Sequence, residues 1–408
     1  MKIFFWCCLA LLIPGLLLRI PVGGAGILAT DIILPVFAFV WLFTKLVITR
    51  NFPRNSFIRP GIIFLVIALI SFVLGTSELL FKEQVLSLAH LLRFASLLIW
   101  GWASTDIFRN EQNSFWKGLF WILTIIVLLG LVQFRFIPDI SSWSREGGLD
   151  PHTGRLLGTW LDPNFMAGLL GFSLPLLIAR WYRSSSTRMK IILGVLIALF
   201  LYALFLTFSR SGYLASCIGL LVFFLFRDWK IIIFGILIIA LGIATNERAQ
   251  KRVGELGGTL SAIVLHETDE IDPTASLRLQ SWQKSFELWQ KYPLLGIGYN
   301  TYRYRASEEG IVDENYFSSG GSDSTHLTIL VTTGILGFLA FMWFLGKIVW
   351  INFHRFLSTR NELFLGFVAG LVTIFIHAFF VNSLLFPLIF MPLIATAGIL
   401  ENMKSGKN

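Results

Sequence analysis

Residues 322–327 combine a carboxylate and an imidazole at the start of an apolar run. Asp323 and His326 are three residues apart, so both lie on one face of a helix that includes them. A carboxylate or a neutral imidazole placed there can act as a general base toward a hydroxyl group. A plainer interpretation is that Asp323 caps the helix and His326 lies at its polar boundary, although capping does not prevent catalysis. We therefore treat both as candidate catalytic residues.

Three arginines stand next to apolar runs in segments that are rich in small polar residues. Arg210 lies between two serines where two apolar runs meet with almost no connection, Arg155 precedes another run, and Arg278 lies in a polar segment. A guanidinium presents its donors in a planar fork that matches phosphate oxygens. The set predicts a site for an anionic headgroup such as a diphosphate, but Arg210 taken alone fits a tight hairpin with a surface arginine equally well. Further candidates in these segments are Asn164 and Arg303.

The residues that usually hold metals, disulfides or nucleotides do not occur in the required patterns. Cys7, Cys8 and Cys217 lie in apolar stretches, two of them adjacent, and no CxxC spacing is present. Gly296 and Gly298 form a lone G-x-G without the rest of a nucleotide fingerprint. The sequence therefore predicts no metal site and no cofactor.

The composition shows which elements must position these residues. Of the 408 residues, 55% are hydrophobic and 14% are charged, and the mean hydropathy is +0.74. Soluble domains carry about 25% charged residues, and one water-soluble core cannot bury this much apolar surface. We expect an all-α polytopic integral membrane protein with about 12 transmembrane helices, of which the last two could instead form a re-entrant pair. The apolar runs are residues 3–18, 32–48, 61–75, 85–103, 117–134, 165–179, 190–207, 212–226, 230–245, 327–349, 363–382 and 384–400.

The distribution of charge predicts the orientation in the membrane. The chain has a net charge of +9, and its basic clusters fall in alternate connections, which the positive-inside rule assigns to the cytoplasm together with both termini. The connection 246–325 instead has 8 basic and 12 acidic residues, a net charge of −4, so the rest of the chain carries +13. We expect spans one to nine in residues 1–245, a large extracytoplasmic loop domain in 246–325, and spans ten to twelve with a short cytoplasmic tail in 326–408.

One segment of the large loop has the pattern of an amphipathic helix. In residues 273–292, Trp282, Phe286 and Trp289 recur at helical spacing and polar residues lie opposite them. This pattern is typical of a helix that rests on a membrane surface, whatever the function.

Five short motifs follow one another between residues 155 and 337: RLLGTWLDPN at 155–164, SRSG at 209–212, LRLQSW at 277–282, PLLGIGYNTY at 293–302 and TTGILG at 332–337. Their order and placement resemble the O-antigen ligase and O-antigen polymerase superfamily. The resemblance implies a glycosyltransferase of the bacterial inner membrane that ligates or polymerises undecaprenyl-diphosphate-linked oligosaccharides on the extracytoplasmic face. Such enzymes act in the synthesis of O-antigen, as part of lipopolysaccharide, and of capsule or exopolysaccharide.

The resemblance also implies roles for individual residues and partners. Arg210 and Arg278 would bind the diphosphate of the donor lipid, and a histidine at the start of the last catalytic helix would deprotonate the acceptor hydroxyl. The transfer would be inverting and independent of metal, because the arginines stabilise the leaving diphosphate. The partners would be a polyprenyl-diphosphate-linked glycan donor, a glycan or lipid-linked acceptor, membrane lipids, and a flippase and a chain-length regulator, with no nucleic acid.

The candidate base departs from the family pattern, in which a His-Asn pair stands eleven residues before the first glycine of the TTGILG motif. In this chain that position holds Asp323, followed by Ser324, and His326 comes three residues later. Either Asp323 has taken over the role of base, or His326 reaches the same place from the next turn, or the two act together; we favour His326 slightly. The departure also favours a polymerase over a ligase.

Two other classes of function compete with this interpretation. A secondary transporter or a flippase for lipid-linked oligosaccharides needs polar residues at mid-membrane depth, and the sequence offers few besides Arg93 and His377. His377 fits a packed, neutral histidine and is not included in the site. A non-catalytic assembly scaffold would not need the arginines outside the cytoplasmic clusters.

Overall fold

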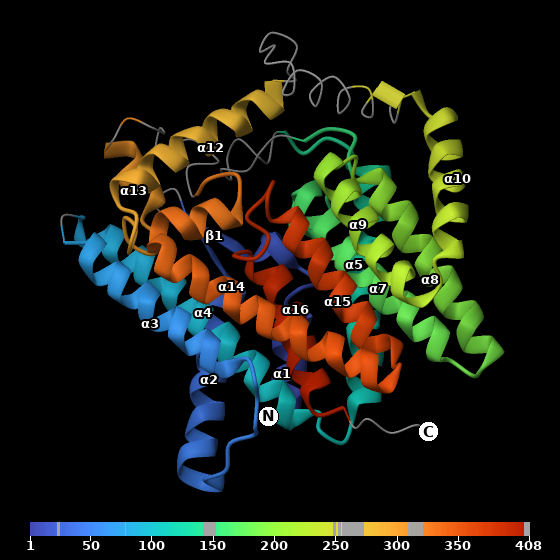
Figure 1. Ribbon diagram of the computed structural model, residues 1–408, viewed down its shortest axis with the longest axis horizontal. Helices are drawn as coiled ribbons and strands as arrows, with labels where there is room; N and C mark the ends of the chain where they lie inside the picture. Colours follow the sequence, from blue (N-terminus) through green and yellow to red (C-terminus); the bar gives the residue numbers. More distant parts are fainter. Residues whose placement is uncertain are drawn as a thin grey trace.

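The computed structural model describes residues 1–22, 25–77, 79–141, 152–247, 250–251, 254, 273–308, 310 and 321–403. The described chain is mostly helical, and most of its helices run side by side in one bundle (Figure 1). Within these residues, eight helices are long and apolar enough to cross a membrane. They are α2 (Ala29–Phe43), which continues into a π-helix (Thr44–Thr49), α3 (Ile58–Gly75), α4 (Phe81–Ile107), α5 (Gln112–Phe136), α7 (Pro163–Arg183), α8 (Thr187–Leu206), α9 (Arg210–Arg227) and α14 (Thr325–Thr359).

Shorter helices complete the bundle at both ends of the chain. They are α1 (Lys2–Ala10), α10 (Lys230–Ala244), α15 (Glu362–His377) and α16 (Pro387–Glu401). At about 1.5 Å per residue, α15 and α16 extend for roughly 22 to 24 Å, which is less than the hydrocarbon thickness of about 30 Å. The polytopic all-α prediction is thus confirmed in outline, while a total of twelve spans stays a prediction.

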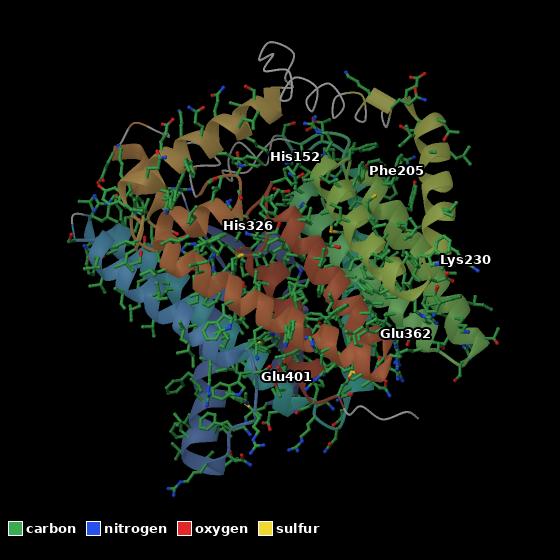
Figure 2. The ribbon with its side chains drawn as sticks, viewed as in Figure 1. His152, Phe205, Lys230, His326, Glu362 and Glu401 are labelled. Atoms are coloured by element: carbon green, nitrogen blue, oxygen red, sulfur yellow. The ribbon has the colours of Figure 1, made fainter. Side chains whose placement is uncertain are left out.

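Two further helices lie across one end of the bundle, here named the α12 end. They are α12 (Pro273–Lys291) and α13 (Tyr302–Glu308), drawn in yellow-orange at the top of Figure 1. The chain begins at the other end, where Lys2 forms an ion pair with Glu111, and α16 finishes there, with Glu401 3.6 Å from Arg355. Figure 2 shows His326 near the α12 end, with Glu362 and Glu401 toward the opposite end.

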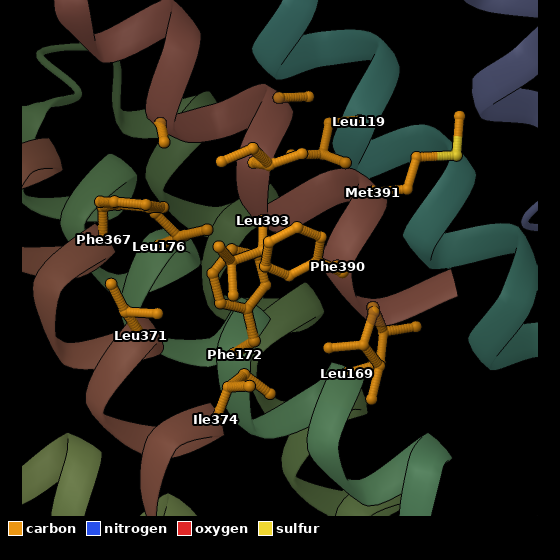
Figure 3. Close-up of a cluster of buried hydrophobic side chains, with 14 of the residues drawn as sticks. Leu119, Leu169, Phe172, Leu176, Phe367, Leu371, Ile374, Phe390, Met391 and Leu393 are labelled. Atoms are coloured by element: carbon orange, nitrogen blue, oxygen red, sulfur yellow. The ribbon is translucent and has the colours of Figure 1, made fainter. Parts of the chain in front are cut away.

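The centre of the bundle is built from α7, α15 and α16, whose side chains are buried on almost all sides. Figure 3 shows Phe172 of α7 and Phe390 of α16 in contact with leucine, isoleucine and phenylalanine side chains of the neighbouring helices. By contrast, α3 and α8 expose Val66, Val73 and Val195 on their outer faces. Exposed apolar faces around a buried apolar centre are the arrangement expected when lipid is the solvent.

One element at the α12 end was not predicted. Strands β1 (Arg19–Val22) and β2 (Ala25–Leu28) pair antiparallel, with Arg19 opposite Leu28. Pro21 and the glycine-rich connection between two apolar runs are typical of a loop, so local sequence gave no signal for a hairpin.

Arg93 and His377, the two residues that the sequence suggests for mid-membrane depth, each contact a polar side chain. Arg93 of α4 makes a two-point ion pair with Asp31 of α2, with Nε 2.5 Å from Oδ1 and Nη2 2.6 Å from Oδ2. His377 of α15 is fully buried, and its Nδ1 lies 2.5 Å from the Ser383 hydroxyl. Both residues therefore link elements of the bundle.

Candidate active site

The start of α14 is held against the connection between α15 and α16. Ser324 caps the helix, because its hydroxyl accepts a hydrogen bond from the backbone N–H three residues on. The Thr325 N–H donates to the Ala378 carbonyl at 2.8 Å, and the Thr325 hydroxyl donates to the Val381 carbonyl at 3.2 Å. Asp323 precedes this cap, so the plainer interpretation of Asp323 as the capping residue is wrong.

The imidazole of His326 is held in one orientation by its surroundings. Its Nε2 lies 3.0 Å from the Phe375 carbonyl, and its ring packs against the rings of Phe375 and Phe379, with centroids 4.6 and 4.3 Å away. A carbonyl can only accept, so we assign the proton of the neutral ring to Nε2. Nδ1 then carries the lone pair, and it is buried without a hydrogen-bond partner in the described part of the chain. His326 is thus oriented as a proton acceptor.

Asp323 faces a different set of elements. Its backbone N–H donates to the Ser281 hydroxyl of α12 at 3.5 Å. On α13, burial raises the pKa of Tyr302, and the nearby Asp323 carboxylate raises it further. The Tyr302 hydroxyl lies 2.7 Å from that of Ser285 on α12. Because α14 begins only at Thr325, Asp323 does not share a helical face with His326 and lies instead toward α12 and α13.

Arg155 binds the backbone of the turn between α8 and α9. Its Nε donates to the Thr207 carbonyl at 2.8 Å and one Nη to the Phe208 carbonyl at 3.3 Å. Phe208 has a φ of 47°, in the left-handed region, so this turn needs external support. The turn ends at Ser209, which caps α9, and Arg210 is the first residue of that helix. Arg155 therefore supports the turn that presents Arg210.

The N-termini of α7 and α9 are tied together beside this turn. The Ser209 hydroxyl donates to the Asn164 side-chain oxygen at 2.8 Å and caps α9 by accepting from the Gly212 N–H at 3.2 Å. Asn164 is the second residue of α7 and Arg210 the first of α9. Helix N-termini carry partial positive charge and favour anions, so Arg210 adds a full charge to a place that already attracts them.

A buried carboxylate that the sequence did not single out connects Arg278 to these helix starts. Asp162 caps α7, accepting hydrogen bonds from the Asn164 and Phe165 N–H groups at 2.6 and 3.2 Å. Burial raises the pKa of Asp162, while these donors and the charges of Arg155 and Arg278 act to lower it. Arg278 of α12 thus lies within electrostatic reach of α7. The signal for Asp162 was the Asp-Pro pair, which is typical of a helix start.

Arg303 lies toward the hairpin. The pKa of Arg19 on β1 is lowered by burial and by the neighbouring charge of Arg303. Arg303 therefore lies within electrostatic reach of the hairpin, whereas Arg155 and Arg278 lie within reach of Asp162 at the start of α7.

A break in α14 sets the direction of the turns that carry His326. Gly334 has φ 64° and ψ −172°, a conformation that only glycine adopts readily. The connection between α12 and α13 enters this break and pairs with both halves of the helix. The Ile297 and Gly298 N–H groups donate to the carbonyls of residues 331 and 332 at 3.0 and 3.2 Å, and the N–H groups of residues 335 and 336 donate to the Pro293 and Leu294 carbonyls at 2.8 and 3.3 Å.

The same contact explains the lone G-x-G pattern. Gly296 has a φ of 71°, and a Cβ added to it would lie 2.4 Å from the Val331 carbonyl oxygen. The glycine allows the chain to approach the break in α14, so the pattern has a packing role and no nucleotide is needed to explain it.

These features define a class: a polytopic helical membrane protein with arginines, helix N-termini and an oriented histidine gathered at one end. Among the described residues, no three His, Cys, Asp or Glu side chains are grouped closely enough to hold a metal ion. The groups at this end that could bind an anion are guanidiniums and the backbone N–H groups of helix N-termini. Residues 193–342 match the family model described as O-antigen ligase, and this match supports the resemblance to the O-antigen ligase superfamily. No curated protein matches the chain. The matched segment includes Arg210, Arg278, Arg303, Asp323 and His326, and it begins after Arg155 and Asn164.

Proposed function

We propose that the protein is a membrane glycosyltransferase that ligates or polymerises oligosaccharides carried on undecaprenyl diphosphate, for O-antigen, capsule or exopolysaccharide. The observation that carries this proposal is the meeting, at the α12 end, of the starts of α7 and α9 with Arg278 of α12. A diphosphate is the anion that suits paired helix N-termini and guanidiniums. The match of residues 193–342 to the O-antigen ligase family model supports the same class of reaction.

In the proposed reaction, the acceptor hydroxyl attacks the anomeric carbon of the donor sugar. The bond from that carbon to the diphosphate oxygen breaks, and its electron pair leaves with the diphosphate. Arg210 and Arg278 stabilise the charge that develops there, while Arg155 holds the Arg210 turn in place. A single displacement of this kind inverts the anomeric configuration and requires no metal.

We assign the base to His326. The Phe375 carbonyl fixes the proton on Nε2, so Nδ1 can take the proton of the acceptor hydroxyl. Asp323 remains the alternative base, and its contacts with α12 and α13 favour a role in holding these helices. Asn164 and Arg303 act in this proposal as a support of the α9 start and as a contact for the glycan, respectively.

We place the α12 end outside the bacterial inner membrane and both termini in the cytoplasm. The end opposite α12 carries basic residues such as Lys45, Arg109 and Arg188, as the positive-inside rule requires of the cytoplasmic side. A flippase would deliver the donor to the outer face, and a chain-length regulator would act on the product.

The experiment is reconstitution of the full chain with an oligosaccharide repeat on a polyprenyl diphosphate. A ladder of longer lipid-linked glycans identifies a polymerase, and one transfer to a separate acceptor identifies a ligase. Arg210→Ala and Arg278→Ala should each lose product, while Arg188→Ala, an exposed arginine at the opposite end, should retain it. Lipid translocation in liposomes without any transfer would instead establish the flippase alternative.

A further inference from the structure

A cavity lies at the end of the bundle opposite α12, away from the candidate active site. Its volume is about 370 Å³, within the range of pockets that hold small molecules. It forms where the chain returns from the tip of α2 and its π-helix to α3, at the lower left of Figure 1. Three parts of the chain line it: residues 51–54, Asp106 and Arg109 at the end of α4, and Asn402 after α16.

Hydrogen bonds with the last turns of α4 hold the walls of this cavity in place. The Trp102 indole N–H donates to the Pro53 carbonyl at 2.8 Å, and the Trp102 ring stacks on that of Phe52 with centroids 5.0 Å apart. On another wall, the Asn402 side-chain amide donates to the Thr105 carbonyl at 2.6 Å. The cavity is thus formed in advance, so a ligand that enters it has little ordering of the protein to offset.

The charges around the cavity favour an anion. Lys45 lies 2.6 Å from Asp106, so the carboxylate that lines the cavity is already balanced. Arg54 and Arg109 are exposed, and within the described residues neither guanidinium has a hydrogen bond or an ion pair. Two positive charges are therefore left for a ligand, on planar donor groups that match phosphate oxygens.

An exposed apolar surface adjoins the cavity. The π-helix before it exposes Leu46, Val47 and Ile48 by 60%, 53% and 68%. Ile48 stands three residues before Asn51, which lines the cavity, so the two are at most about 11 Å apart along the chain. Basic residues that follow a lipid-facing helix lie at the depth of phospholipid headgroups. A ligand that fits both surfaces has an anionic phosphate and a hydrocarbon part.

We propose that this cavity binds the phosphate of an anionic phospholipid, whose acyl chains lie along the exposed face of the π-helix. A soluble phosphate would make no use of that apolar face. A zwitterionic headgroup would bring its own positive charge against Arg54 and Arg109, so a headgroup with a net negative charge is preferred. The bound lipid would join the connection between α2 and α3 to α4 and to the segment after α16. The cavity shares no residue with the proposed glycan transfer, so this site does not depend on the proposed function.

Two double variants that remove equal charge from the same end of the protein provide the test. Arg54→Gln/Arg109→Gln removes the proposed phosphate donors. Arg59→Gln/Arg188→Gln removes two arginines outside the cavity, one on α3 and one on α8, and is the matched control. All four side chains are exposed, so both variants should melt like wild type when no phospholipid is added.

Each full-length protein is purified in a non-ionic detergent and titrated with phosphatidylglycerol or phosphatidylcholine, and bound lipids are counted by native mass spectrometry. We expect wild type and the control to bind phosphatidylglycerol about tenfold or more tightly than phosphatidylcholine. Arg54→Gln/Arg109→Gln should weaken phosphatidylglycerol binding about thirtyfold, because each arginine near an anionic headgroup contributes roughly fivefold. Phosphatidylglycerol should also raise the melting temperature of wild type and not of this variant, since a ligand of the folded state stabilises it.

Equal loss of phosphatidylglycerol binding in both double variants would overturn the proposal, because the basic surface as a whole and not the cavity would then attract the lipid. Unchanged binding in Arg54→Gln/Arg109→Gln would overturn it as well. A further titration adds free glycerol phosphate, which we expect to leave phosphatidylglycerol binding unchanged. Full displacement of the lipid by glycerol phosphate would identify a site for soluble phosphates and contradict the assignment to a phospholipid.

Discussion

Replacement of Gly334 by alanine tests whether the break in α14 is an essential part of the fold. The backbone of Gly334 lies in a region that costs an L-residue about 1–3 kcal/mol. A Cβ at this position would also lie 2.2 Å from the Leu294 carbonyl carbon and oxygen, which are backbone atoms and cannot rotate away. The connection between α12 and α13 must therefore move.

The movement breaks the pairing that joins the connection to α14. Four backbone hydrogen bonds link them, and each contributes about 0.5–1.5 kcal/mol. If the strain and half of these bonds are lost, Gly334→Ala destabilises the protein by about 2–6 kcal/mol. We also expect kcat to fall, because the turns beyond the break carry His326.

The assay is thermal melting in lipid nanodiscs together with glycan transfer at low temperature. Gly194→Ala is the control, since this helical glycine has open space beyond its Cβ and alanine is about 0.5–1 kcal/mol more favourable in a helix interior. We expect the control to melt at or above the wild-type temperature. A Gly334→Ala variant that melts and reacts like wild type would refute the reasoning, because the strain and the close contact would then have no energetic consequence.

Three other substitutions separate catalytic from structural roles. His326→Ala should lower kcat by about 10²- to 10⁴-fold while Asp323→Asn keeps most of it; the reverse order, measured by single-turnover transfer, would assign the base to Asp323. Arg155→Ala removes two bonds to the turn before α9 and should lower stability by about 1–3 kcal/mol in thermal melts; a raised donor KM without any loss of stability would contradict its supporting role. Arg93→Leu leaves Asp31 buried without its partner and should cost about 3–5 kcal/mol, with partial recovery in the Arg93→Leu/Asp31→Leu double variant; equal melting of single and double variants would disprove the ion pair's importance.

The sequence predicted the eight long apolar helices because each coincides with its own apolar run, whereas the run 3–18 contains only α1 (Lys2–Ala10) and a 3₁₀-helix (Gly15–Leu18). Residues 117–134 were predicted for one span, and α5 occupies Gln112–Phe136. The helix is longer than the apolar run because its backbone hydrogen bonds continue beyond the hydrocarbon region of the membrane. The segment predicted as an amphipathic helix is indeed helical, as α12. Ser285 and Leu288 of this helix are buried against the protein and Phe286 is 45% exposed, while its contact with a membrane surface stays a prediction.

The contacts of the candidate site depend on residues far apart in the chain, and local spacing could not supply them. Arg155 was predicted to bind a diphosphate, but its described hydrogen bonds reach carbonyls more than 50 residues away. The break at Gly334 could likewise not be predicted, because the apolar run 327–349 continues on both sides of it. The left-handed conformation of Gly334 is required only because the connection between α12 and α13 packs into the break.

That docking connects the two halves of the proposed site. Arg278, proposed to bind the donor diphosphate, lies on α12, and the connection that enters the break in α14 follows α12 directly. The turns beyond the break carry His326, and the Asp323 N–H donates to Ser281 on the same α12. The start of α14 is thus connected to α12 in two ways, by the backbone pairing at the break and by the hydrogen bond from the Asp323 N–H to the Ser281 hydroxyl. Because packed interfaces have few alternative arrangements, we expect the position of the proposed base to depend on α12, the helix proposed to bind the leaving group.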